Sequence, residues 1–186
     1  MKTKLILLAL VAFSFKSFSQ TKNAIYFQYG TSTDKLSTPK EYYTGGGFGG
    51  GDNRGLGGNM IGLKYVYTLN RWLSLSSGIS YSKDRFHFAG VLPGHDYETI
   101  KLISVPATLN FNFLKYLFVD AGITADFQQQ KTIQAASQTG VGIELGGGAK
   151  YNFGPVGLFV NPYFQERSGK DRLISRGFKF GAGYCF

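Results

Sequence analysis

The chain has 186 residues and a formal net charge of +9, with 26 glycines, 16% aromatic residues and a single cysteine. This length suits one domain, and the abundance of large apolar residues argues against an intrinsically disordered chain or a coiled coil. One thiol excludes a disulfide framework and a cysteine-based zinc cluster.

The first 19 residues have the layout of a secretory signal peptide. Lys2 and Lys4 precede an apolar run from Leu5 to Phe15, and Ser17 and Ser19 supply small residues at the −3 and −1 positions of a cleavage site. An N-terminal membrane anchor is the alternative, but the apolar run is much shorter than the ~20 residues that a spanning helix needs. We therefore expect residues 1–19 to be removed and residues 20–186 to form one domain with a net charge of +6.

The rest of the chain alternates between apolar and polar residues, which is the pattern of strands with one apolar face. Eight segments show it, weakly in the first and the seventh. In chain order their apolar faces are Ile25, Phe27, Tyr29; Ile61, Leu63, Tyr65, Tyr67, Leu69; Leu73, Leu75, Ile79, Tyr81; Ile103, Val105, Ala107, Leu109, Phe111, Phe113; Leu117, Val119, Ala121, Ile123, Ala125, Phe127; Val141, Ile143, Leu145, Tyr151, Phe153; Val156, Leu158, Val160, Phe164; and Phe178, Phe180, Ala182, Tyr184, Phe186.

The connections between these segments alternate in length. Tight turns are predicted at Asn70-Arg71-Trp72, Leu114-Lys115-Tyr116 and Gly154-Pro155, and longer polar loops at 32–58, 87–98, 131–139 and 168–174. Short turns at one end and long loops at the other are typical of outer-membrane barrels. The sequence thus predicts an all-β fold, an eight-stranded antiparallel up-and-down transmembrane β-barrel with both termini in the periplasm.

Alternation alone also fits a soluble, lipocalin-like barrel with its apolar face inside. The apolar faces carry too many bulky side chains for the interior of eight strands, so we expect them to meet lipid. Aromatic residues gather near the short turns, where they would form an interfacial girdle. The girdle comprises Tyr67, Trp72, Phe113, Tyr116, Phe153 and Tyr184, with Phe186 at the chain end.

The opposite face is polar and carries charged residues that would share one narrow lumen. Buried charges need partners, so we expect a network of acids and bases that fills the barrel, rather than a proton or ion path. Its predicted members are Lys64, Asp120, Asp126, Glu144, Lys150, Arg167 and Lys179. Cys185 lies on the same face, where we expect it to fill space.

Three features could indicate ligand chemistry, and each has a plainer interpretation. The glycine-rich stretch 45–58 lacks the flanking strand, helix and Lys-Ser/Thr pair of a phosphate-binding loop, so we expect an external loop. His87 and His95 lie near Asp84, Asp96, Glu98 and Ser82, a set that could serve acyl transfer or metal binding but is also ordinary for a barrel rim. We predict no catalytic residues, no cofactor and no metal.

The basic residues are scattered and form no stripe suited to nucleic acid. Eight of them fall in or near the predicted external loops, where anionic lipopolysaccharide would lie. They are Lys35, Lys40, Arg54, Lys83, Arg85, Lys131, Lys170 and Arg172. Outer-membrane lipid and lipopolysaccharide are therefore the expected partners, with a possible envelope protein at loop 32–58.

Three short motifs resemble the PorT-like outer-membrane β-barrel family of Gram-negative bacteria over residues 22–186. They are Ile103-Ser104-Val105-Pro106, the turn from Asn70 to Leu75, and the closing stretch from Gly181 to Phe186. The terminal Phe186, after aromatic residues at alternate positions, also resembles the strand that the barrel assembly machinery binds during insertion. The resemblance implies the fold and the outer membrane. It allows a structural or surface-interaction protein, or a narrow pore or subunit of an export or gliding apparatus, and implies no shared catalytic residues.

Overall fold

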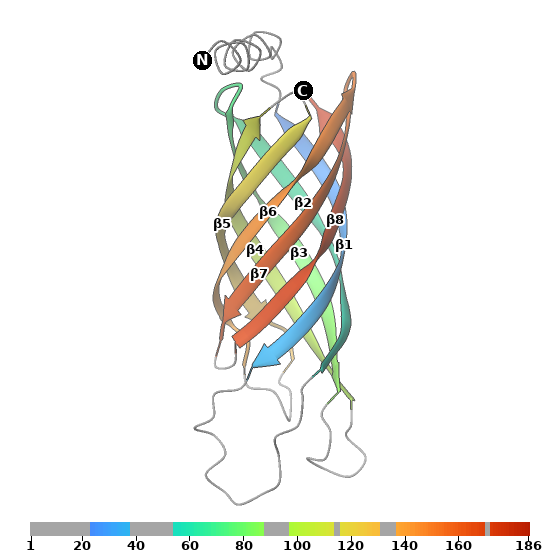
Figure 1. Ribbon diagram of the computed structural model, residues 1–186, viewed down its shortest axis with the longest axis vertical. Helices are drawn as coiled ribbons and strands as arrows, with labels where there is room; N and C mark the ends of the chain where they lie inside the picture. Colours follow the sequence, from blue (N-terminus) through green and yellow to red (C-terminus); the bar gives the residue numbers. More distant parts are fainter. Residues whose placement is uncertain (1–22, 38–53, 88–96, 114–115, 131–136, 170–171) are drawn as a thin grey trace, which may run out of the picture.

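The computed structural model describes residues 23–37, 54–87, 97–113, 116–130, 137–169 and 172–186. These residues form eight strands in one closed barrel (Figure 1). The strands are β1 (Ala24–Ser37), β2 (Arg54–Thr68), β3 (Leu73–His87), β4 (Tyr97–Phe113), β5 (Leu117–Gln128), β6 (Gly140–Phe153), β7 (Val156–Ser168) and β8 (Arg172–Cys185).

Each strand pairs with its sequence neighbours, and the barrel closes because β1 also pairs with β8. That last pairing is continuous and antiparallel, from Ala24 opposite Cys185 to Ser37 opposite Arg172. Closure leaves no strand edge without a partner, which a sheet surrounded by hydrocarbon requires. The predicted eight-stranded antiparallel up-and-down barrel is confirmed.

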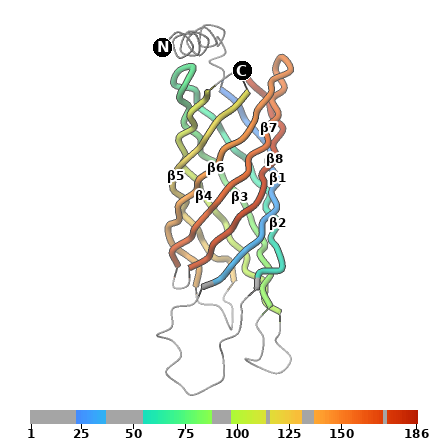
Figure 2. The backbone as a smooth tube through the Cα atoms, in the orientation of Figure 1, coloured from blue at the N-terminus to red at the C-terminus, as the bar shows by residue number. Residues whose placement is uncertain are grey.

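The start of β1 and the end of β8 lie at the same end of the barrel as the short turns (Figures 1 and 2). In the turn between β2 and β3, the Asn70 side-chain oxygen accepts hydrogen bonds from the backbone N–H groups of Trp72 and Leu73, at 2.8 and 2.9 Å. In the turn between β6 and β7, Gly154 has a φ of +62°, which residues with a side chain rarely adopt. This end is called the short-turn end below.

At the opposite, long-loop end the strands continue further than predicted. The loops expected at 32–58 and 168–174 are shorter, because β1 runs to Ser37, β2 begins at Arg54 and β8 begins at Arg172. The glycine-rich stretch 45–58 is therefore strand from residue 54 onward, with a bulge where Gly57 has a φ of +104°. The predicted loop boundaries were wrong there, since β1 pairs with both β2 and β8 beyond the apolar band.

Two prolines interrupt the backbone pairing. The β3–β4 pairing is interrupted between Ser77–Ala107 and Ser80–Ser104, around Pro106, and the β6–β7 pairing between Gly146–Tyr163 and Ala149–Val160, around Pro162, with the register unchanged. Proline has no N–H to donate to a neighbouring strand. The prolines therefore account for local gaps in an otherwise continuous sheet.

In the described part of the chain, no helix has the length and hydropathy needed to cross a membrane.

Candidate functional site

The polar interior is the first candidate site, and its middle contains two ion pairs. The Lys179 ammonium lies 2.5 Å from a Glu144 carboxylate oxygen, and the Lys64 ammonium lies 3.6 Å from Asp120. The Asn161 side-chain amide also donates a hydrogen bond to the Asp120 carboxylate, at 2.9 Å. These pairs join β8 to β6 and β2 to β5, so they bridge strands that are not neighbours in the sheet.

Closer to the long-loop end, Arg167 is the centre of a second charged cluster. Its guanidinium lies 3.4 Å from Asp126 and 3.9 Å from Asp84, and it donates to Ser175 and Gln165 at 3.0 Å each. Ser104 and Thr124 both donate to the Asp126 carboxylate. The Arg167 cluster thus links β7 to β3, β5 and β8 across the lumen.

Two acids of this cluster were not predicted as lumen residues. Asp34 and Asp84 are buried, and each accepts a hydrogen bond from the serine two residues earlier, Ser32 or Ser82. Gly58 leaves room for them, because a Cβ there would approach the carboxylates of both. Their inward direction was missed because both positions were assigned to loops or to the rim, although the period of two places them in phase with the lumen face.

Of the predicted network, Lys150 has a different kind of partner. Its ammonium donates to the Asn112 side-chain oxygen at 2.6 Å. Among the described residues it forms no ion pair with a carboxylate. The expectation of a fully acid–base network is therefore wrong at Lys150, which an amide accommodates.

The sequence predicted a lumen that is polar throughout. The structure instead contains apolar clusters inside the barrel. At the long-loop end, Leu36, Phe86, Ile100, Leu102 and Leu173 form a buried cluster, called the outer cluster below. Leu36 and Phe86 are the next inward residues after Asp34 and Asp84, so the outer cluster lies directly beyond the Arg167 cluster. Phe86, Ile100, Leu102 and Leu173 have no exposed surface, so solvent does not reach these four side chains.

A second apolar cluster occupies the short-turn end. Ala24, Tyr26 and Cys185 are buried there against Val66 and Phe159, and this set is called the inner cluster below. The Tyr26 and Phe159 rings meet edge to face at 5.1 Å, and the Tyr26 hydroxyl lies 3.7 Å from the Cys185 sulfur. Cys185 is a free, buried cysteine, and the ion pairs in the middle of the lumen lie between the two apolar clusters.

The described members of the rim set do not form one site. Ser82 and Asp84 point into the barrel, whereas His87 lies at the end of β3 with its ring 5.1 Å from that of Tyr97. Glu98 is half-buried, and His95 and Asp96 lie outside the described residues. Within the described part of the chain, no group of three or more His, Cys, Asp or Glu side chains has an arrangement suited to a metal ion.

The outer surface of the barrel is apolar. Large hydrophobic residues on every strand are exposed, including Leu63, Leu109 and Ile143, each between 43% and 52%. The band runs from Leu73 to Tyr81 on β3 and from Ile103 to Phe113 on β4, close to the ~9–11 residues that a tilted strand needs to cross a bilayer. Such a surface suits lipid and does not suit water.

The predicted girdle residues lie on this surface at the short-turn end. Tyr67, Phe113, Tyr116, Phe153 and Tyr184 are exposed, and Trp72 is half-buried beneath Arg71, whose guanidinium lies 5.1 Å from the ring centre. Phe186 is 53% exposed and stacks with Tyr184 at 6.3 Å.

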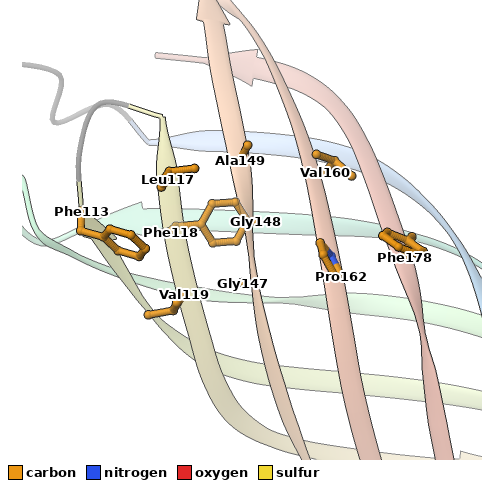
Figure 3. Close-up of a pocket in the computed structure, with 10 residues that line it drawn as sticks. All are labelled: Phe113, Leu117, Phe118, Val119, Gly147, Gly148, Ala149, Val160, Pro162 and Phe178. Carbon is orange, nitrogen blue, oxygen red and sulfur yellow. The ribbon is translucent and has the colours of Figure 1, made fainter.

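A shallow groove of about 470 Å³ interrupts the apolar surface between β5 and β8 (Figure 3). Its floor is formed where Gly147, Gly148 and Ala149 present almost no side chain, and Phe113 and Phe178 lie at its sides. Because the lining is apolar like the rest of the band, the groove belongs to the same lipid-facing surface.

The predicted rim cations lie in different surroundings. Lys35, Lys83, Arg85 and Arg172 are exposed on the outer face, and Arg172 pairs with Glu166 at 2.6 Å. Arg54 begins β2. Lys40, Lys131 and Lys170 lie outside the described residues, as does most of the glycine-rich stretch.

Comparisons with known proteins agree with this architecture. A family model described as "Outer membrane protein beta-barrel domain" matches residues 5–186. Two solved structures share the fold. Ail, the attachment invasion locus protein of Yersinia pestis, in complex with the heparin analogue sucrose octasulfate, has a TM-score of 0.53 at 19% identity, covering 90% of this chain and 99% of that one. The outer membrane protein OprG from Pseudomonas aeruginosa has a TM-score of 0.58 at 12% identity, covering 90% and 97%. A search of curated proteins found no match.

Proposed function

Since this chain belongs to the outer membrane protein β-barrel domain family, we propose that it is a sealed barrel with a structural or surface-interaction role and no through-pore. One observation carries this proposal. The ion pairs in the middle of the lumen lie between the outer cluster and the inner cluster, and at the short-turn end Lys150 lies beside the inner cluster, hydrogen-bonded to Asn112. An ion that crosses would have to shed its water at each of the two clusters, and narrow hydrophobic constrictions oppose that.

We propose that the long-loop end faces the cell exterior and that both termini are periplasmic. The short turns and aromatic girdle at the other end support this orientation. Lipopolysaccharide would then surround the cations of the long-loop end, the barrel assembly machinery would bind the chain end at Phe186, and an envelope protein would bind the connection between β1 and β2. Ail is in complex with sucrose octasulfate, a polyanion, which supports surface contact with anions as a role for such barrels.

The PorT-like resemblance supports a second role, as a narrow pore or as a subunit of an export or gliding apparatus. The motifs Ile103 to Pro106 and Gly181 to Phe186 lie on β4 and β8, in the lipid-facing wall. These two motifs support a role for β4 and β8 in the barrel wall, but they provide no evidence for an open lumen. We therefore favour the sealed barrel. We propose no reaction, because the described members of the rim set are divided between the lumen and the end of β3.

Conductance across a planar bilayer tests the sealed lumen. Folded protein is reconstituted, insertion is verified by faster gel migration of the unboiled sample, and current is recorded at 1 M KCl with a known eight-stranded pore as positive control. We expect no steady steps. Long-lived steps in most insertions would refute the sealed barrel and favour the pore.

Cysteine labelling in intact cells tests the orientation. In a Cys185→Ala background, Thr33→Cys lies on the exposed long-loop end and Arg71→Cys on an exposed short turn. A membrane-impermeant maleimide should label residue 33 before lysis and residue 71 only afterwards. The reverse pattern would invert the proposed orientation.

A further inference from the structure

Three cations form a group on the outer face of β3 and β4, immediately beyond the apolar band. Lys83 and Lys101 are directly opposite each other in the register, and Arg85 is the next outward residue on β3. One step nearer the membrane, the opposed residues are Tyr81 and Ile103, which end the apolar band on both strands. The change from apolar to cationic therefore occurs at one level on two neighbouring strands. Lys83, Arg85 and Lys101 are called the cationic group below.

Two lysines directly opposed on one face of an antiparallel pair repel each other, since their Cβ atoms lie about 5 Å apart. No described carboxylate relieves this repulsion by an ion pair with any member of the cationic group. The Lys83 ammonium lies 5.7 Å from the centre of the Tyr81 ring, which holds it near the edge of the apolar band.

The β7–β8 side of the barrel shows the contrast. There the exposed Arg172 is neutralised by Glu166, with a guanidinium–carboxylate distance of 2.6 Å and two hydrogen-bonding contacts. Arg176 lies over the Phe164 ring at 5.5 Å. The two sides thus differ in neutralisation: Arg172 has a carboxylate partner, whereas among the described residues no carboxylate pairs with a member of the cationic group.

We propose that the cationic group binds the phosphate monoester of a glycolipid in the outer leaflet. A phosphate between Lys83 and Lys101 would replace their repulsion with two attractive contacts, and Arg85 would supply a bidentate donor from the side. The acyl chains of the same lipid would lie below it, against Ile79, Tyr81 and Ile103. The apolar path that begins directly under the cations favours a lipid over a soluble anion.

This inference rests on the proposed outer-membrane placement of the long-loop end. The binding measurement itself uses purified barrel in nanodiscs and is independent of orientation in the cell. A failure of the inference is therefore distinguishable from a failure of the proposed function, which conductance and labelling test.

The experiment measures retention of hexa-acylated lipid A by wild-type barrel in phosphatidylcholine nanodiscs, by native mass spectrometry over a lipid titration. Dephosphorylated lipid A is the ligand control. We expect Lys83→Gln/Lys101→Gln to weaken binding of the phosphorylated form by about five-fold per lysine, hence about 25-fold. We also expect binding to weaken as salt rises, and Lys83→Arg/Lys101→Arg to restore it.

The matched control is Lys35→Gln/Arg176→Gln, which removes two outward charges from β1 and β8. It should weaken binding by less than about two-fold, and both double variants should keep the gel shift of a folded barrel. If both double variants lost lipid A binding equally, net charge alone would explain the attraction, and the proposed site at the cationic group would be wrong. Equal binding of dephosphorylated lipid A, or full displacement by millimolar inorganic phosphate, would overturn a lipid phosphate as the ligand.

Discussion

The ion pair between Glu144 and Lys179 allows a quantitative test of the enclosed lumen. Both side chains are almost fully buried, with exposed fractions of 6% and 7%, and their charged atoms lie 2.5 Å apart. Replacing Lys179 with methionine would leave the Glu144 carboxylate without its closest cation. Removing one partner of a buried pair costs about 3–5 kcal/mol of stability, because the remaining charge is desolvated and uncompensated.

The double variant Glu144→Met/Lys179→Met separates this cost from the loss of packing. With no charge left unpaired at this position, it should recover about 2 kcal/mol or more of the stability lost by Lys179→Met. Urea unfolding and refolding in lipid vesicles measures the free energy, with Trp72, the single tryptophan of the chain, as the fluorescent reporter. The gel shift of unboiled samples provides a second probe of the folded state.

The exposed pair Glu166–Arg172 is the matched control, because it has similar geometry on the outer surface. Glu166→Gln should change stability little, since water solvates a surface charge that loses its partner. Losses below about 1 kcal/mol in both Glu144→Met and Lys179→Met, with additive effects in the double variant, would mean that water solvates the middle of the lumen. The reasoning for a sealed barrel would then be refuted.

Three further substitutions, the first with a control variant, test other parts of the structure by unfolding or by the yield of folded barrel. Ile143→Arg places a charge against hydrocarbon and should cost about 2–4 kcal/mol of the free energy of unfolding. Thr33→Arg, at the exposed long-loop end, is the control and should be tolerated. Equal effects of the two substitutions would contradict the lipid-facing assignment of Ile143. Phe86→Ala removes the aromatic ring of the outer cluster and should cost about 3–5 kcal/mol. Gly58→Ala brings a Cβ against the Asp84 carboxylate and should impair folding, and wild-type yield of folded barrel would show that this space is not needed.

The strands and their outward faces were predictable because the alternation is almost unbroken within the membrane band. A period of two fixes which face each residue occupies once one face is buried or lipid-facing. Leu109 and Ile143 on the outside and Lys64 and Glu144 on the inside follow from the pattern alone. Which cation meets which acid did not follow, since cross-lumen partners depend on the shear of the closed barrel.

The long-loop end was misread for a physical reason. Beyond the band the outside of the wall meets water, so the polarity of the two faces is exchanged while the period continues. Lys83 and Arg85 point outward there, and Asp84 and Phe86 point inward. If apolar side chains are expected to point outward, as they do in the membrane band, such a stretch is mistaken for a polar loop. A search for alternation of the opposite polarity would have found Leu36 and Leu173 as part of the outer cluster.

The cross-lumen contacts also affect how such a sequence can change over time. A lipid-facing position can exchange one apolar residue for another with little effect on its neighbours. A change at Lys64 or Lys179 is tolerated only with a matching change at Asp120 or Glu144, far away in the chain. Substitutions in the lumen should therefore accumulate in pairs between distant strands. Substitutions should be frequent at lipid-facing positions. At lumen positions they should be rare and correlated between contacting residues.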